Sequence, residues 1–475
     1  MIIKNREELL SHGNIKARKI ACDLIDFAME AIDASGLTRK LVRRDRDVLK
    51  VGSLVYDLTA VGDIYVLGAG KAVLQIAEAL DDILGDRIKA GVVVEKRLDG
   101  MTRGVDRIRR FRKIKVLEGA HPVPDEVAVQ GAKEILDLAR AAKEGDLVFF
   151  CVQGGCTCLT TMPADGLTLD DVQETTDLLL KSGWEIRAVN SVRTAITTLS
   201  WGRLAKFIHP AEIINLVVND YVWNYPRDQQ KDEYALGWGP SVPLPDGRRA
   251  DFERNLSFFK EHEIWEKVPE RVRNHIMNWD SGLLPQTVED FERMGFNYHT
   301  FVLASPQDGA EAAKRGAERM GLNSMILSSM IEGEASEVGA VFAAIAKEIG
   351  KNRRPLEPPC VVIAAGEKTV TIVGEHGQGG RNQESVLSAA LRIDGGDDIA
   401  ILSIGTDGTD GPSYIAGGIV DGYSVRRAKE KGMNPVDHLN KHNSSYVLTE
   451  LGDAILFDEP GNNVCDLSLI VVTDR

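Results

Sequence analysis

The chain of 475 residues is too long for one ordinary hydrophobic core and predicts two or three domains. Hydrophobic residues make up 43% and charged residues 27%, as in globular proteins, and the formal net charge is −14. So acidic a chain is a poor partner for nucleic acid or an anionic membrane surface, and we expect neither. The sequence shows no membrane span and no signal peptide, and its six cysteines form no Cys-x-x-Cys pair, which favours a reduced, cytoplasmic protein.

Short apolar strands alternate with amphipathic helices along the first half of the chain. A helix with one apolar face is expected over 15–35. The strands that follow are expected at 63–68, 91–95, 114–117, 146–152 and 213–218, and the helices at 71–84 and 126–143. Residues 224–296 interrupt the pattern because they are polar and rich in Trp, Pro and Arg, so we expect loops and short helices there.

The alternation resumes near residue 300 and indicates a second α/β domain. Its strands are expected at 300–304, 324–328, 360–364, 369–373, 399–404 and 467–472, with helices ending near 320 and 349 and one over 383–391. This order predicts two domains, 1–296 and 297–475, each built on a mostly parallel, Rossmann-like sheet. Ligands of such folds bind outside the carboxyl ends of the strands, so we expect the active site in the cleft between the domains.

A glycine-rich turn, Gly68-Ala-Gly70-Lys71, follows the first of these strands and opens a helix. Glycines let an anion approach the backbone, and a helix N-terminus favours negative charge. Lys71 adds a point charge suited to a phosphate or a carboxylate. The turn also begins a Gly-x-Gly-x-x-Gly pattern, and Glu95 stands where a ribose-binding acid would, but position 73 is Val. An anion site, a nicotinamide site and a purely structural turn all stay open.

A second glycine turn follows the predicted strand 146–152. It contains Gly154, Gly155 and the Thr157 hydroxyl, which together can form an anion nest. Cys156 and Cys158 flank that hydroxyl but lack the spacing of a metal site, so buried thiols are the plainer interpretation.

Residues 377–384 form a glycine run that turns into a helix and places Arg381, Asn382 and Glu384 at its first turn. A structural loop rarely needs so many polar groups at one helix start. Arg381 can hold a carboxylate or a phosphate with two parallel hydrogen bonds, so we favour a functional interpretation.

Two aspartates, Asp407 and Asp410, follow the predicted strand 399–404. Carboxylates at a strand end suit magnesium binding or general-base chemistry, and the alternative is an Asx-turn loop with solvated acids. A polar turn at 461–466 is explained as well by capping as by function. His121, at a strand end, either faces the cleft or is a structural histidine.

Taken in order, these motifs resemble the class II glycerate 2-kinases, whose C-terminal half carries the MOFRL domain, here at about 360–472. The matching segments are 66–72, 119–126, 164–171, 190–193, 202–205, 377–384, 405–422 and 462–467. They span nearly the whole chain, and the large blocks of the second half are highly specific. Some members of this family are labelled hydroxypyruvate reductases.

The resemblance implies a phosphotransferase with an alcohol group as acceptor, which uses ATP and Mg²⁺ to phosphorylate the 2-hydroxyl of D-glycerate or a related small hydroxy acid. Lys71 and Arg381 match the family's functional lysine and arginine, and we expect them to stabilise the phosphoryl group and the substrate carboxylate. Asp407 or Asp410 would hold magnesium or accept the hydroxyl proton. The further expected substrate and nucleotide contacts are Gly68, Gly70, Gly154, Gly155, Thr157, Asn190, Arg193, Asp220, Asn382 and Glu384.

Several positions depart from the family's usual pattern. They are Cys156, Thr157, Thr194, Ala195, Asn219, Trp238 and Pro306. Thr194 and Ala195 replace a lysine and a histidine, and each lost charged hydrogen bond weakens binding by about 1–3 kcal/mol. Either the acceptor site or the nucleotide site has therefore changed. If an acid other than glycerate is the acceptor, we expect Thr194, Trp223, Tyr225 and Trp238 to set specificity.

Three rival functions remain beside the glycerate kinase. One is a kinase of a bulkier or less charged hydroxy acid. Another is an NAD(P)-dependent hydroxypyruvate reductase, which leans on Gly68, Gly70 and Glu95 and is weakened by Lys71 and Val73. The last is a non-catalytic sensor of a small acid or nucleotide. The expected partners are a small hydroxy acid and a nucleotide, and the assembly we allow for is a homodimer.

Overall fold

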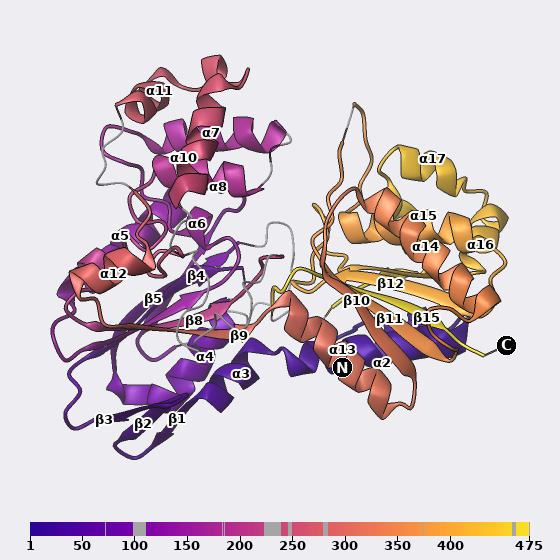
Figure 1. Cartoon of the computed structure of the whole chain (residues 1–475), viewed down its shortest axis with the longest axis horizontal. Helices are drawn as coiled ribbons and strands as arrows, with labels where there is room; N and C mark the ends of the chain where they lie inside the picture. The colour runs from indigo at the N-terminus through magenta and orange to yellow at the C-terminus, as the bar shows by residue number, and fades with distance from the viewer. Residues whose placement is uncertain are drawn as a thin grey trace. The chain divides into compact units, whose positions relative to one another are not determined.

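The computed structural model describes residues 1–71, 73–97, 111–182, 184, 186–222, 239–245, 249–278, 284–372, 374–457 and 462–474 (Figure 1). The chain divides into two compact units. We call Ala34–Val218 with Asn224–Leu303 the N-terminal unit, and Met1–Asp33, Asn219–Trp223 and Ala304–Arg475 the C-terminal unit. No helix of the described residues is long and apolar enough to cross a membrane.

The N-terminal unit is built on a six-stranded sheet in the order β6-β5-β4-β7-β8-β9. The strands are β4 (Ile64–Gly70), β5 (Ile88–Lys96), β6 (Ile114–Gly119), β7 (Leu147–Val152), β8 (Glu212–Val218) and β9 (Tyr298–Ala304). All neighbours from β6 to β8 are parallel. From β4 the chain adds β5 and β6 on one side and then returns to add β7 and β8 on the other side. The point between β4 and β7 is therefore a topological switch point, where ligands of open α/β sheets bind.

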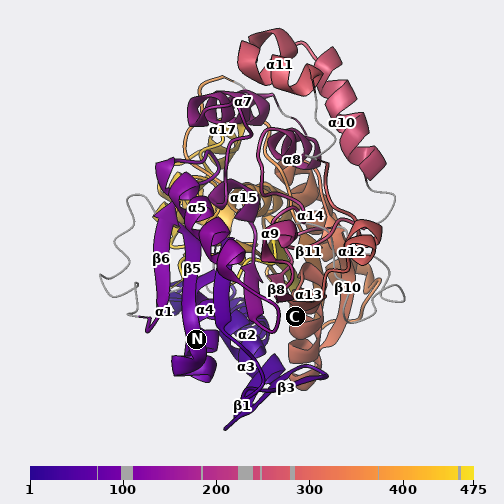
Figure 2. The same ribbon diagram turned by 90° about the vertical axis from the view of Figure 1, so that its left-hand side faces the viewer.

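Helices cover this sheet and extend beyond it. Figure 2 shows a group of helices at one end of the strands and a small three-stranded sheet at the opposite end. The group contains α7 (Leu169–Lys181), α8 (Ile186–Ala195), α10 (Arg249–Glu261) and α11 (Glu270–Met277). The other elements are α3 (Ala34–Leu41), β1 (Val42–Asp45), β2 (Val48–Val51), β3 (Leu54–Asp57), α4 (Val73–Leu84), η1 (Gly85–Arg87), α5 (Glu126–Ala141), α6 (Cys156–Leu159), α9 (Ala205–Ile208), η3 (Trp265–Lys267) and α12 (Val288–Met294).

The region 224–296, where the sequence predicts loops and short helices, contributes to an apolar core where it is described. Phe252 and Phe259 of α10 and Val272 of α11 pack with Val189 of α8 and Val172 of α7. The helix α10 is longer than expected, because its apolar residues recur at helical spacing within a sequence dominated by charge.

The C-terminal unit has a six-stranded sheet in the order β10-β11-β15-β12-β13-β14. Its strands are β10 (Asn323–Ile331), β11 (Cys360–Gly366), β12 (Ile399–Gly405), β13 (Gly417–Asp421), β14 (Ala454–Ile455) and β15 (Asp466–Val472). Only β10 and β11 are a parallel pair, and the other four neighbouring pairs are antiparallel. The two-domain α/β architecture is confirmed. In this sheet β10, β11 and β12 run in the same direction, as in the expected parallel sheet, but most hydrogen-bonded neighbours are antiparallel. The final strand, β15, inserts between β11 and β12 against their direction.

Helices cover both faces of this second sheet. Helices α14 (Ala335–Asn352) and α15 (Arg381–Ile393) lie on one face, and α2 (Ile15–Ala31) and α13 (Pro306–Arg319) on the other (Figure 1). The remaining helices are α1 (Arg6–Leu9), α16 (Ser424–Glu430), α17 (Pro435–Asn440) and α18 (Ser444–Leu451). The predicted strand 369–373 is wrong for its described residues, where Thr369 forms only an isolated bridge to Glu334.

The observed units differ from the predicted domains at the N-terminus, because residues 1–33 belong with the C-terminal unit. A buried ion network explains this. Arg18 of α2 pairs with Asp421 and, at 2.9 Å, with Asp453, which also accepts from His12 and Arg427. Burial by itself raises the pKa of Asp453, but these partners outweigh it and lower the pKa to about 2. The ionised carboxylate thus stabilises the fold above its usual pKa of 3.8 and loses that effect as the pH falls toward 2.

We predict that Arg18→Met lowers the free energy of unfolding by about 3–5 kcal/mol, because it leaves two buried carboxylates without their shared cation. Urea titration followed by circular dichroism measures this loss. The matched control is Lys19→Met, at a 62% exposed position paired with Asp23, which should cost less than about 1 kcal/mol. Equal losses in the two variants would contradict the account of the network.

Candidate active site

The glycine turn after β4 packs directly on the turn after β7. The Lys71 N–H donates to Gly154 O at 2.9 Å, and the Gln153 N–H donates to Ala69 O at 3.2 Å. A Cβ on Gly70 would lie 2.4 Å from the Gln153 Cβ, so only glycine lets the two turns approach this closely. The two expected glycine motifs are therefore brought together at the switch point.

The carboxylate of Glu95, at the end of β5, is buried against the start of α4. Glu95 is 1% exposed and accepts a hydrogen bond from Leu74 N, in the first turn of α4, at 3.2 Å. It thus lies where a dinucleotide pyrophosphate would bind in a Rossmann fold, and its negative charge disfavours that group. The nicotinamide interpretation of this turn loses its main support.

Cations gather around His121, which follows β6. A Cβ on Gly155 would lie 2.8 Å from His121 Cδ2 and 3.5 Å from Lys71 Cγ, so both side chains lie against this turn. Burial lowers the pKa of His121 well below its usual value, and the charges of Lys71, Lys96 and Arg193 lower it further. Within the described residues, the charges that shift the pKa of this imidazole are positive, so His121 is neutral at physiological pH and lies in a positive field.

Arg193 of α8 is 6% exposed, and its guanidinium donates to Pro122 O at 2.8 Å and to Asn190 Oδ1 at 3.4 Å. Both acceptors are neutral, and desolvation lowers the pKa of Arg193. Its Nε and both amide atoms of Gln153, a fully buried residue, have no hydrogen-bond partner in the described part of the chain. Each such unpaired group lowers the stability of the fold by about 1–3 kcal/mol. Folding alone therefore does not explain why these polar side chains are buried here.

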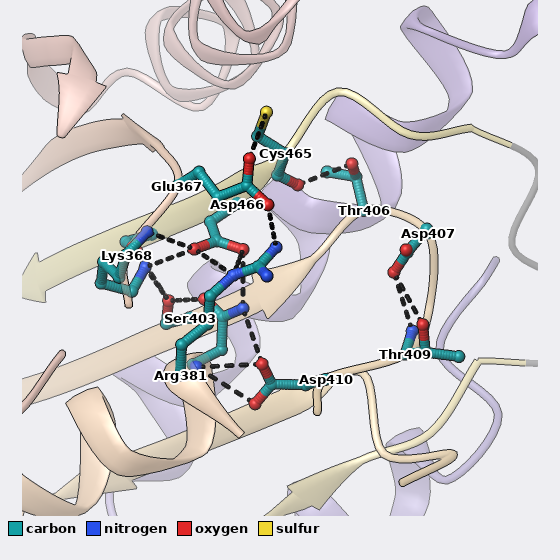
Figure 3. A network of polar contacts seen from close by, with 12 residues as sticks. Glu367, Lys368, Arg381, Ser403, Thr406, Asp407, Thr409, Asp410, Cys465 and Asp466 are labelled. Atoms are coloured by element: carbon teal, nitrogen blue, oxygen red, sulfur yellow. Dashed lines mark hydrogen bonds and ion pairs between the residues drawn. The ribbon is translucent and has the colours of Figure 1, made fainter. Parts of the chain in front are cut away.

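In the C-terminal unit, polar side chains meet where β11 and β12 end and β15 begins (Figure 3). We call Glu367, Lys368, Arg381, Asp410 and Asp466 the Arg381 cluster. Arg381 donates from Nε to both Asp466 oxygens at 2.9 and 3.0 Å, and Nη2 lies 3.3 Å from Glu367. Desolvation by itself lowers the pKa of Arg381, but the surrounding carboxylates outweigh it and raise the pKa well above its usual value. The side chain stays 27% exposed, so a fixed cation faces outward from this cluster.

The carboxylate of Asp410 has an internal role. It is 1% exposed and accepts from the backbone N–H of Asn382 and of Gln383 at 2.9–3.1 Å. It therefore caps the N-terminus of α15, where Gly380 has no side chain to do so. Burial is the main cause that raises the pKa of Asp410. A role of Asp410 in metal binding stays a prediction.

Asp407 is less enclosed than Asp410. Its Oδ1 accepts from the backbone and the hydroxyl of Thr409, both at 3.1 Å, which is the Asx-turn that the sequence left open (Figure 3). Among the described residues, no group of three or more His, Cys, Asp or Glu side chains is arranged to hold a metal. Magnesium, however, is often bound by one or two carboxylates together with nucleotide phosphates and water, and Asp407 fits that pattern.

The other predicted contact residues have mostly internal partners. Asn382 is fully buried and bridges Asp410 and Asp466, while Glu384 pairs with His442 at 2.9 Å. Asp220 accepts from Asn463 at 2.8 Å. The functional roles of these residues stay predictions.

Sequence reasoning missed Glu367 and Lys368 as site residues, and it singled out the turn that contains Asp466 without assigning that side chain a role. Lys368 is 3% exposed and lies 3.2 Å from Asp466, and its Nζ also donates to the Ser403 hydroxyl. The available signal was position alone, since Glu367 and Lys368 directly follow a buried strand and Asp466 begins one.

Some departures from the family pattern have a structural explanation. Pro306 is the first residue of α13, where proline is favoured, and Ser305 caps that helix. Thr194 and Ala195 are buried in α8, and all six cysteines are buried thiols that form no disulfide within the described residues. Trp223, Tyr225 and Trp238, predicted to set specificity, lie outside the described residues.

Cations fixed at the carboxyl ends of strands in both units are the features of an α/β enzyme that acts on small anions. Residues 20–277 match a family model described as a domain of unknown function, DUF4147, and residues 360–466 match the MOFRL family. A glycerate 2-kinase of Pyrococcus horikoshii is 36% identical over 96% of this chain and 98% of its own length. A D-glycerate 2-kinase of Thermotoga maritima is 34% identical over 85% of this chain and 89% of its own.

Solved structures agree with these matches. The crystal structure of a glycerate kinase from Thermotoga maritima has a TM-score of 0.74 at 30% identity, covering 96% of this chain and 99% of that one. A relative from Agrobacterium vitis, 31% identical over 87% of this chain and all of its own length, is named a putative hydroxypyruvate reductase. The chain belongs to the glycerate 2-kinase family with a MOFRL region.

We predict that Asp410→Asn lowers the free energy of unfolding by about 1–3 kcal/mol, because an amide NH₂ would face the N–H groups at the start of α15. Asp407→Asn should leave stability within about 1 kcal/mol, since its Asx-turn tolerates asparagine. Urea unfolding of the two variants in parallel measures the difference. A stable Asp410→Asn protein would refute the capping role.

Proposed function

We propose that this protein is a kinase that transfers the terminal phosphoryl group of ATP to the 2-hydroxyl of D-glycerate or a closely related hydroxy acid. The observation that carries the proposal is the partly exposed, ion-paired Arg381 at the carboxyl end of the second sheet, in a chain that aligns with a named glycerate 2-kinase over 96% of its length. Lys71, at the switch point of the first sheet, is the second cation in the proposal.

Phosphoryl transfer is mainly a problem of positioning and of neutralising negative charge. Arg381 suits this task because Asp466 and Glu367 hold its Nε and Nη2, while the side chain as a whole stays 27% exposed. Lys71 lies on a turn whose backbone is fixed by the bond to Gly154 O. Arg381 would therefore meet an anionic group without first having to be ordered, while Lys71 would extend its ammonium from a fixed backbone.

Magnesium is part of the proposal, and bound to the nucleotide it would neutralise the phosphate charges. Within the Arg381 cluster and its neighbour Asp407, four carboxyl groups accompany the two cations Arg381 and Lys368, so there is a surplus of acidic groups. A divalent cation would balance that surplus. We assign its protein contact to Asp407 rather than to Asp410, because the oxygens of Asp410 already cap α15.

The hydroxypyruvate reductase named among the relatives remains the second candidate function. The sequence supported a reductase through the glycine turn together with Glu95 as a ribose-binding acid. The carboxylate of Glu95, however, is buried against the start of α4. A nicotinamide cofactor would need the same helix N-terminus for its pyrophosphate. The kinase is therefore the better explanation of the site.

We predict that Lys71→Ala lowers kcat for glycerate phosphorylation about 100-fold or more, as for removal of one fixed group that stabilises transition-state charge. The matched control is Lys89→Ala in the same unit, a 58% exposed lysine paired with Asp63, which should keep wild-type turnover. A coupled assay for ADP measures both. Turnover of Lys71→Ala within about threefold of wild type would remove Lys71 from the mechanism.

We predict that ATP consumption with Mg²⁺ depends on D-glycerate in a panel of small hydroxy acids. Loss of absorbance at 340 nm with NADH and hydroxypyruvate, tested on the same preparation, should not exceed background. Turnover of another acid alone would reassign the acceptor while keeping the kinase. NADH oxidation without ATP consumption would replace the kinase by the reductase.

A further inference from the structure

The guanidinium of Arg193 is the clearest candidate for a ligand contact that the fold itself does not explain. It is nearly buried, and both groups to which it donates, Pro122 O and Asn190 Oδ1, are neutral. Its Nε has no partner in the described part of the chain. A buried arginine normally pairs with a carboxylate, so this side chain fits an anion that arrives from outside.

A second unpaired group lies at the same switch point. The side-chain amide of Gln153 is fully buried, yet both its oxygen and its nitrogen lack a partner within the described residues. Gln153 belongs to the same turn as Gly155, and the backbone of Gly155 lies against the His121 imidazole. An amide and a neutral imidazole offer a donor and acceptors, which is what a hydroxyl group needs.

The charge pattern favours a carboxylate over a polyphosphate at this place. Arg193, Lys71 and Lys96 act on His121 and make the site attractive to an anion. Glu95, buried at the start of α4, places a negative charge at the helix N-terminus that a phosphate chain would otherwise use. Arg193 is also only 6% exposed, so a small anion suits its surroundings better than a long phosphate chain.

We propose that Arg193 binds the carboxylate of the hydroxy acid, and that Gln153 and His121 hydrogen-bond its hydroxyl end. This acid subsite rests on the proposed kinase function and assigns its acceptor to the N-terminal unit. The subsite requires an α-hydroxy carboxylate, because the carboxylate meets the arginine and the hydroxyl meets the amide and the imidazole. A neutral analogue such as glyceramide lacks the charge that Arg193 recognises.

The first test is the specificity of Arg193→Gln. We expect KM for D-glycerate to rise about 10- to 100-fold, with KM for ATP within about twofold of wild type. The preference for D-glycerate over glyceramide, taken as the ratio of their kcat/KM values, should fall by a similar factor. This ratio compares two substrates on one protein sample, so a partly unfolded variant does not distort it. Arg271→Gln, at a 66% exposed position of the same unit, is the matched control and should leave all values unchanged.

The second test uses Gln153→Leu, which removes the unpaired amide. We expect the variant to be as stable as wild type or more so, because an unsatisfied buried group is replaced by an apolar one. We also expect its affinity for D-glycerate, measured by calorimetry without nucleotide, to fall at least about fivefold. A merely structural glutamine would lose stability and keep its affinity.

The outcomes separate the two proposals. If the wild-type protein does not phosphorylate glycerate, the proposed function fails, whatever the variants do. If it does, but Arg193→Gln keeps both KM for glycerate and the preference over glyceramide within about threefold, the acid subsite alone is refuted. A rise in KM for ATP without one for glycerate would likewise overturn it, since Arg193 would then bind a phosphate.

Discussion

One buried carboxylate, that of Asp466, organises the polar end of the C-terminal unit. It is 1% exposed and accepts from the Lys368 backbone, from Arg381 Nε and from the Asn382 amide, and it pairs with the Lys368 ammonium. Burial raises its pKa, but Arg381 and Lys368 outweigh burial and lower it. Because β15 lies between β11 and β12, this one side chain connects the ends of two other strands with the start of α15. The orientation of Arg381, and with it the proposed chemistry, depends on that insertion.

In both units a carboxylate from another segment accepts hydrogen bonds from the backbone N–H groups at the start of a helix. Glu95 reaches the start of α4 from the end of β5, and Asp410 reaches the start of α15 from the loop after β12. Helix starts that follow glycine turns are common anion sites, but here the positive end of each helix is already neutralised. In the proposed function, anion binding therefore falls to side-chain cations, namely Lys71 and Arg193 in one unit and Arg381 in the other. This arrangement argues against a dinucleotide site and agrees with phosphoryl transfer to a small acid.

The sequence by itself determined the class of fold and the motifs of the site. Buried apolar strands at regular spacing predicted β4, β7, β8, β11 and β12 close to their observed bounds, because central strands need apolar residues on both faces. The glycine turns were identified, but the reason differs: the sequence suggested room for an anion, whereas a Cβ on Gly70 would collide with Gln153 of the neighbouring turn. Lys71 and Arg381 were found because each follows a glycine run at a helix start.

Only the tertiary structure decided how these side chains are used. Spacing could not show that Asp410 caps a helix while Asp407 stays in a turn, because the N–H groups that Asp410 receives belong to residues 27 and 28 positions earlier. Nor could it place Arg18 with the last third of the chain, or pair Asp466 with Lys368 almost a hundred residues away. The direction of β15 was equally hidden, since an apolar strand pattern is the same read in either direction. Local patterns specify elements, but ion pairs and strand order depend on contacts between distant residues, which no local pattern contains.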